Sequence, residues 1–177
     1  RIEERVARMR RDRPGADAAE LVDLHRRLSE RDRYFRFATL HPRDVEGYVA
    51  RTLDPAHGAL ALGARVQGRL VGAVQLLPLG GELAEVSAVV DAGERNDGVA
   101  TALLEELAAT AQRWGIHRLQ AYVLADNGPM LQVLTGLGMP LTTTRDGPGL
   151  CLEVALEPGP RYFEASEARH RSAAVAG

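Results

Sequence analysis

Lysine is absent from this sequence, and cysteine is nearly so. All 22 basic residues are Arg, which we attribute to a coding bias. The single cysteine, Cys151, cannot form an internal disulfide, and nothing after Arg1 resembles a signal peptide. We therefore expect a protein of the reducing cytoplasm.

Long apolar runs and blocks of one charge are also missing. The longest stretch without a charge, residues 127–144, contains three glycines, two prolines and four threonines, so it is not a membrane-spanning helix. The net charge is −2 and no basic block stands alone, which argues against nucleic acid as a partner. The histidines are scattered without metal-ligand spacing, so no metal is predicted.

The length of 177 residues suits one domain with a single core. Apolar periodicity predicts helices over 17–28 and 42–53, strands over 59–66, 70–79 and 83–90, and a helix over 100–114. A strand over 119–125, a helix over 127–137 and two closing strands at 141–144 and 150–156 follow, and residues 5–16 allow at most a short edge strand. This order indicates a mixed α/β sheet with helices on its faces, in a domain of residues 1–157 followed by a linker or tail at 158–177.

The turn at 91–101 carries the strongest chemical signal. It reads Arg95-Asn96-Asp97-Gly98-Val99-Ala100 and leads straight into an amphipathic helix. Small residues let a ligand approach the backbone, and the first turn of a helix has unpaired N–H groups that favour anions. Tight packing on the sheet would explain the same small residues. The turn has neither the lysine of a P-loop nor a G-x-G-x-x-G run.

In its context this turn resembles the pyrophosphate loop of the GNAT N-acetyltransferases, [RQ]-x-x-G-x-[GA], and the resemblance covers roughly residues 15–157. It implies the GNAT fold, a mostly antiparallel sheet splayed at the cofactor site with helices on both faces, and acetyl-CoA as co-substrate. Asn127 matches the position that contacts the pantetheine arm. The cofactor-binding residues implied are Ala88, Val89, Val90, Arg95, Asn96, Asp97, Gly98, Val99, Ala100, Thr101, Asn127 and Met130.

Acetyl transfer to an amine needs a base, because an alkylammonium is only about one part in two thousand free amine at pH 7. Glu85, in the strand LAEVSAVV, is the candidate, and it resembles the base of the bacterial Pat-type protein acetyltransferases, whose strand reads like A-E-F-A-V-V-V. A carboxylate in a strand of Ala, Val and Leu suggests function, although a solvent-facing side of the strand would also accommodate it. Glu82, beside two glycines, is the weaker candidate.

One position departs from the wider family. Many members have a Tyr seven residues after the Asn to protonate the leaving thiolate, but here that residue is Leu134. Another group or water then supplies the proton, or the thiolate leaves unaided. We interpret Tyr122 as a core or edge aromatic, and Cys151 as a buried structural thiol.

The segment LHRRLSERDRYFRF resembles the L-S-x-x-S-x-Y-x-R-F signature of the Pat-type enzymes, which implies that Tyr34, Arg36 and Phe37 bind the acceptor. Core packing would also explain these aromatics. Those enzymes acetylate lysines on other proteins, notably acyl-CoA synthetases, and are often fused to a regulatory domain. The start at Arg1 and the linker-like end fit an excised domain.

Charge and the missing Tyr leave two alternatives open. From Gly81 to Glu157 there are eleven acidic residues against four Arg, which favours a cationic acceptor, either a lysine or a small-molecule amine. A non-catalytic domain that senses acyl-CoA is the other alternative, because of Leu134. The prediction is an acetyltransferase that acts on protein lysines, with no membrane partner.

Overall fold

The computed structural model describes residues 6–8, 17–32, 44–54, 56, 58–94, 98–156, 168 and 171. The strands are β1 (Val6–Arg8), β2 (Leu60–Val66), β3 (Arg69–Gly80), β4 (Leu83–Val90), β5 (Arg118–Leu124), β6 (Leu141–Asp146) and β7 (Gly149–Ala155). The helices are α1 (Asp17–Arg26), α3 (Val45–Thr52), the short 3-10 helix η3 (Ala92–Glu94), α4 (Val99–Arg113) and α5 (Gly128–Gly136). No described helix is long and apolar enough to cross a membrane.

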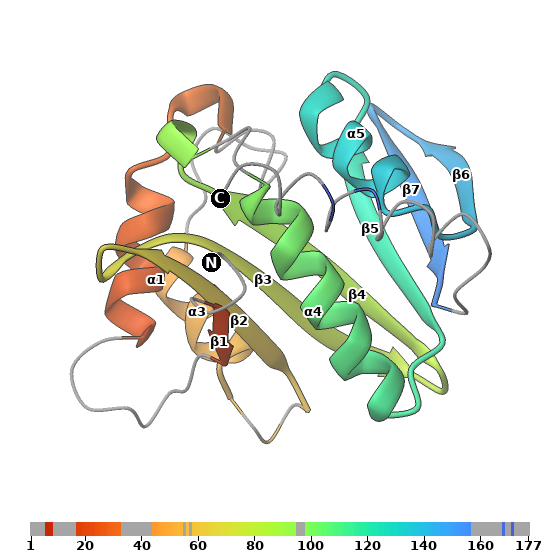
Figure 1. The fold of residues 1–177 in the computed structure, drawn as a ribbon, viewed down its shortest axis with the longest axis horizontal. Coiled ribbons are helices and arrows are strands. Elements are labelled where there is room, and N and C mark those ends of the chain that lie inside the picture. The colour runs from red at the N-terminus through yellow and green to blue at the C-terminus, as the bar shows by residue number, and fades with distance from the viewer. Residues whose placement is uncertain are drawn as a thin grey trace.

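The strands form one seven-stranded sheet in the order β1-β2-β3-β4-β5-β7-β6. All neighbours are antiparallel except β4 and β5, which are parallel. That parallel pair is short: its register runs from Leu83 opposite Arg118 to Glu85 opposite Gln120 and then stops. Figure 1 shows β5 diverging from β4 toward α5. The expected splayed and mostly antiparallel sheet is confirmed.

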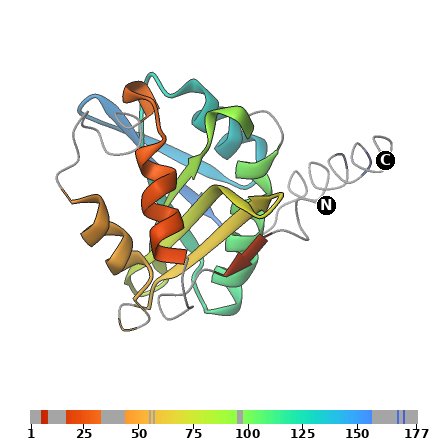
Figure 2. The same cartoon turned by 90° about the vertical axis from the view of Figure 1, so that its left-hand side faces the viewer.

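Helices cover both faces of the sheet, as Figure 2 shows from the side. On one face, α4 and α5 bury a core that reaches from Leu60 on β2 to Val154 on β7. On the other face, α1 and α3 pack on β2, β3 and β4 through a smaller core that includes Leu24, Val49 and Val89. Alternation along a strand therefore decides which face each side chain of β4 occupies.

Several local expectations hold and one does not. The hairpin between β2 and β3 turns at Gln67 and Gly68, both with positive φ, as in a tight two-residue hairpin turn. Asn127 caps α5 and a proline occupies its first turn. The second helix, expected to start at Pro42, instead begins at Val45. There the Asp44 carboxylate accepts from the Gly47 N–H, so a capping side chain and not a proline marks the start.

Gly72 on β3 lets α4 lie close to the sheet. A Cβ at this position would come within 2.8 Å of Val99 Cγ1 and 3.2 Å of Leu103 Cδ1. We expect Gly72→Val to lower the free energy of unfolding by about 1–3 kcal/mol, the usual effect of overpacking. Thermal unfolding by calorimetry measures this.

Gly136→Ala is the control for this variant. A Cβ at Gly136, in α5, would meet nothing within 4 Å. The alanine should leave stability unchanged or raise it by up to about 1 kcal/mol through helix propensity. Equal melting temperatures for Gly72→Val and the parent protein would contradict the packing argument.

Candidate active site

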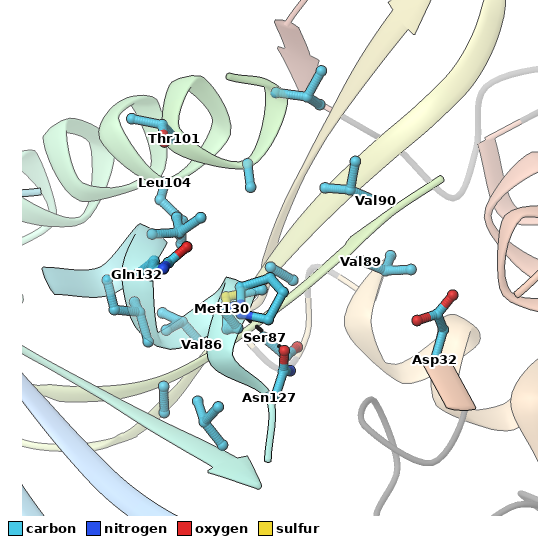
Figure 3. A pocket seen from close by; sticks show the side chains of 18 of the residues that line it. Asp32, Val86, Ser87, Val89, Val90, Thr101, Leu104, Asn127, Met130 and Gln132 are labelled. Carbon is cyan, nitrogen blue, oxygen red and sulfur yellow. Dashed lines mark hydrogen bonds between the residues drawn. The ribbon is translucent and has the colours of Figure 1, made fainter. Parts of the chain in front are cut away.

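A cavity of about 650 Å³ opens where β4 and β5 separate. Figure 3 shows Thr101 and Leu104 of α4 and Met130 and Gln132 of α5 around the same space, with Val90 of β4 opposite. The described lining residues are Leu28, Arg31, Asp32, Val86, Ser87, Ala88, Val89, Val90, Glu94, Gly98, Val99, Ala100, Thr101, Leu104, Ala121, Tyr122, Val123, Asn127, Pro129, Met130, Gln132, Val133 and Leu134.

One end of the cavity is the start of α4. Gly98 precedes the helix with φ +75°, a conformation that favours glycine, and an added Cβ would have no neighbour within 4 Å. No described side chain caps this helix, whereas α3 and α5 each have a side-chain cap. The first helical bond runs from the Ala102 N–H to the Gly98 carbonyl, so the N–H groups of residues 99–101 precede the intrahelical ladder. This end can hold an anion of the size of a diphosphate.

The β4 strand forms one wall of the cavity. One edge of β4 is paired with β3 from Leu83 to Val90. In the described part of the chain, no strand pairs with the other edge of β4 after Glu85. Ala88, Val89 and Val90 all line the cavity. The unpaired backbone edge can hydrogen-bond to the amides of an extended ligand, as an added strand would.

Asn127 lies on the opposite side of the cavity. Its Oδ1 accepts from the Met130 N–H at 3.3 Å, which fixes the side chain at the start of α5. Because the oxygen serves as the cap, the Nδ2 hydrogens are the donors available to a ligand carbonyl. Both Asn127 and Met130 line the cavity, as the resemblance implied.

Three charged side chains that line the cavity were not assigned a role from the sequence. Arg31 and Asp32 follow α1, and Glu94 is in η3. Arg31 is the one cation among the described lining residues. Arg31 and Asp32 lie within the segment LHRRLSERDRYFRF, but a role was predicted only for the later residues of that segment.

Glu85 is exposed on the β4 face that carries α1 and α3, and it is not among the residues that line the cavity. Its place is nevertheless distinctive, since it is the last β4 residue paired with β5 before the strands separate. Ser87, the next residue on the same face, does line the cavity. Because Glu85 faces solvent, its carboxylate is tolerated in an otherwise apolar strand. Glu85 lies at the point where β4 and β5 begin to separate. Glu82 lies in the turn before β4, as expected.

A hydrogen-bonded chain of polar side chains backs Ser87. The Ser87 hydroxyl donates to Gln75 Oε1 at 3.2 Å and lies 3.0 Å from the Tyr48 hydroxyl. Gln75 is only 2% exposed, so this contact provides a partner for a buried amide. The chain joins α3, β3 and β4, and the long separations between its members hide it from a reading of the sequence.

Leu134, at the position of the expected Tyr, is buried and lines the cavity without a proton to donate. Tyr122 is neither a core nor an edge aromatic, because it is 45% exposed and also lines the cavity from central strand β5. Cys151 is half-buried and not fully buried, and its Sγ accepts from Gln120 Nε2 at 3.0 Å. These two interpretations were wrong because no described helix covers their face of β5 and β7.

Six predicted site residues lie outside the described part of the chain. They are Arg95, Asn96 and Asp97 of the loop before α4, and Tyr34, Arg36 and Phe37 of the segment expected to bind the acceptor. The structure brings together the other predicted cofactor residues, from Ala88 to Val90 on β4, from Gly98 to Thr101 at α4 and at Asn127 and Met130.

Known proteins share this sequence pattern and architecture. The family described as Acetyltransferase (GNAT) family matches residues 21–139. The solved GNAT domain of S. lividans PAT is similar at 28% identity and a TM-score of 0.75, over 85% of this chain and 89% of that one. An aminoglycoside 6'-acetyltransferase type Ii has 19% identity and a TM-score of 0.68, over 88% and 99%. For yncA from Salmonella typhimurium, solved with its cofactor acetyl-CoA, the values are 16% and 0.65, over 88% and 96%.

Proposed function

Because this chain belongs to the acetyltransferase (GNAT) family, we propose that it transfers the acetyl group of acetyl-CoA to the ε-amine of a lysine on a target protein, with Glu85 as general base. The observation that carries the proposal is the position of Glu85 at the last paired residue of β4 and β5, beside the cavity. An acyl-CoA synthetase-like enzyme of the cytoplasm is the proposed target. The similarity to the GNAT domain of S. lividans PAT supports a protein lysine as the acceptor.

The polar groups around the cavity suit the groups of acetyl-CoA. The N–H groups at residues 99–101 and the open space at Gly98 suit the diphosphate. The free edge of β4 and the amide of Asn127 suit the two pantetheine amides. When bound, acetyl-CoA supplies the thioester carbonyl that an amine attacks.

Glu85 removes the proton that blocks this attack. The carboxylate accepts a proton from the lysine ammonium and leaves a lone pair on nitrogen. Glu85 is exposed, and no described side chain forms an ion pair with it, so it can meet an ammonium that arrives from solvent. Glu85 does not line the cavity, so in this proposal it meets the acceptor on the sheet face that carries α1 and α3.

Mass spectrometry of a cell lysate incubated with the protein and isotopically labelled acetyl-CoA tests the proposal. The chain has no lysine, so every labelled lysine belongs to another protein. We expect label on a small set of lysines, lost when Glu85 is replaced by Gln. Label confined to small amines would favour a small-molecule acetyltransferase instead.

A non-catalytic acyl-CoA sensor is the second candidate, and the burial of Leu134 in the cavity wall favours it. Calorimetry distinguishes it from an enzyme. A sensor binds acetyl-CoA without any turnover, whereas an enzyme releases CoA once an amine acceptor is present.

A further inference from the structure

On the β3 side, Glu85 has an exposed apolar neighbour. Leu77 lies directly opposite Glu85 in the antiparallel ladder of β3 and β4, so both side chains occupy the same sheet face. Leu77 is 37% exposed, which is unusual for a leucine in a strand of the core sheet. An exposed carboxylate therefore has an apolar neighbour within one strand spacing.

On the β5 side, Tyr122 is held rigidly. Its hydroxyl donates to the Asp146 carbonyl oxygen at 3.2 Å. Its ring lies over Gly149 of β7, where an added Cβ would come within 2.6 Å of Tyr122 Cζ. Tyr122 is two residues beyond Gln120, the register partner of Glu85, so it shares the face of Glu85 and faces the splay. The ring is a fixed, half-exposed wall of the cavity.

Two other acidic side chains near this face have basic partners. Glu153 binds Arg118 Nη1 at 2.9 Å, and Glu82 lies 3.9 Å from His117 Nε2. Gln120 donates to Cys151. Within the described part of the chain, neither Glu85 nor Asp146 of β6, an exposed carboxylate on the same face, forms an ion pair, and of the two it is Glu85 that lies where β4 and β5 separate.

We infer that Leu77 and Tyr122 form the two walls of an acceptor subsite that selects an amine on an unbranched alkyl chain. The inference rests on the proposed function and narrows its acceptor. The methylenes lie between the two apolar walls, the ammonium meets Glu85, and the Tyr122 ring adds a cation–π contact. An aminosugar, which carries hydroxyls beside its amine, would lose their hydration against Leu77 and Tyr122.

The test is an NMR titration with ethylamine, butylamine, pentylamine and glucosamine in the presence of CoA, with acetyl transfer to each amine measured in parallel. Burial of each methylene should tighten binding by up to about fourfold, so pentylamine should bind more tightly than ethylamine, and glucosamine should bind weakly. In Leu77→Ala and Tyr122→Ala the dependence on chain length should flatten. For transfer to pentylamine, KM should rise more than kcat falls.

Trp114→Ala is the matched control, because Trp114 is 43% exposed and lies at the end of α4, under Arg8. It should keep the chain-length dependence. Tyr122→Phe retains the ring and should keep most of the chain-length dependence. If thermal unfolding shows that Tyr122→Ala is unstable, Tyr122→Phe and Leu77→Ala test the subsite instead.

The outcomes separate this inference from the proposed function. A flat amine series, equal binding of glucosamine and pentylamine, or a steep series that survives both alanine variants would overturn the subsite, even with lysine transfer intact. A steep series that depends on Leu77 and Tyr122, without transfer to any amine, would support the subsite and contradict the proposed function.

Discussion

Glu85→Gln is expected to lower kcat for lysine acetylation by about a hundredfold to ten-thousandfold, the usual contribution of a general base. The amide has the size of the carboxylate but does not accept a proton at neutral pH. Affinity for CoA should be unchanged, because Glu85 does not line the cavity. Steady-state kinetics at saturating acetyl-CoA and calorimetry with CoA measure the two quantities.

The pH dependence adds a second criterion. As pH rises toward the pKa of the acceptor amine, more of the amine is free and the base matters less. The ratio of parent to Glu85→Gln rates should therefore shrink with rising pH. A uniform ratio across pH would assign Glu85 a role in binding rather than in proton transfer.

Glu82→Gln is the matched control for this experiment. Glu82 is exposed, lies three residues earlier, and removal of its carboxylate changes the local charge by the same amount. Since the Glu82 side chain lies in the turn before β4 and does not line the cavity, we expect rates within about twofold of the parent, as for other surface changes. Undiminished transfer in Glu85→Gln would refute its role as the base.

The second large effect concerns Gly98. Gly98→Val should weaken CoA binding by more than about a hundredfold, because loss of two hydrogen bonds to a charged group corresponds to several kcal/mol. The valine side chain would fill the open space at the start of α4, and φ +75° is strained for a β-branched residue. Calorimetry with CoA measures the change.

Gly115→Val controls for backbone strain. Gly115 follows the other end of α4, has φ +80°, and an added Cβ there would meet nothing within 4 Å. It should cost similar stability and leave CoA affinity intact. If Gly115→Val weakens CoA binding as much as Gly98→Val does, general destabilisation and not the phosphate site explains the loss.

Local sequence patterns predicted most of the fold, and they singled out residues at the starts of α4 and α5 that line the cavity. Gly98 and Asn127 could be assigned because their roles depend on neighbours in sequence, namely a helix start and a cap. The acceptor side was harder to predict. A tyrosine such as Tyr122 in an apolar strand resembles a core residue, and only the tertiary arrangement leaves its face without a described helix.

Contacts between segments that are distant in sequence explain why other cavity residues were not predicted. The bond between Tyr48 and Ser87 joins residues 39 apart, and Arg31 reaches the cavity only through the docking of α1. The Pro42 expectation failed for a local reason, because Asp44 provides a better start for the helix.

The short pairing of β4 and β5 also divides the sheet mechanically. Among the described residues, the strands from β1 to β4 and the group of β5, β7 and β6 are joined by backbone hydrogen bonds only at Glu82 and along the short pairing from Leu83 to Glu85, and otherwise by the shared core under α4. A ligand that hydrogen-bonds to the free edge of β4 and also contacts β5 or α5 would link the two parts of the sheet. Amide hydrogen exchange at Val86–Val90 should therefore slow when CoA binds, and the two halves should unfold more cooperatively.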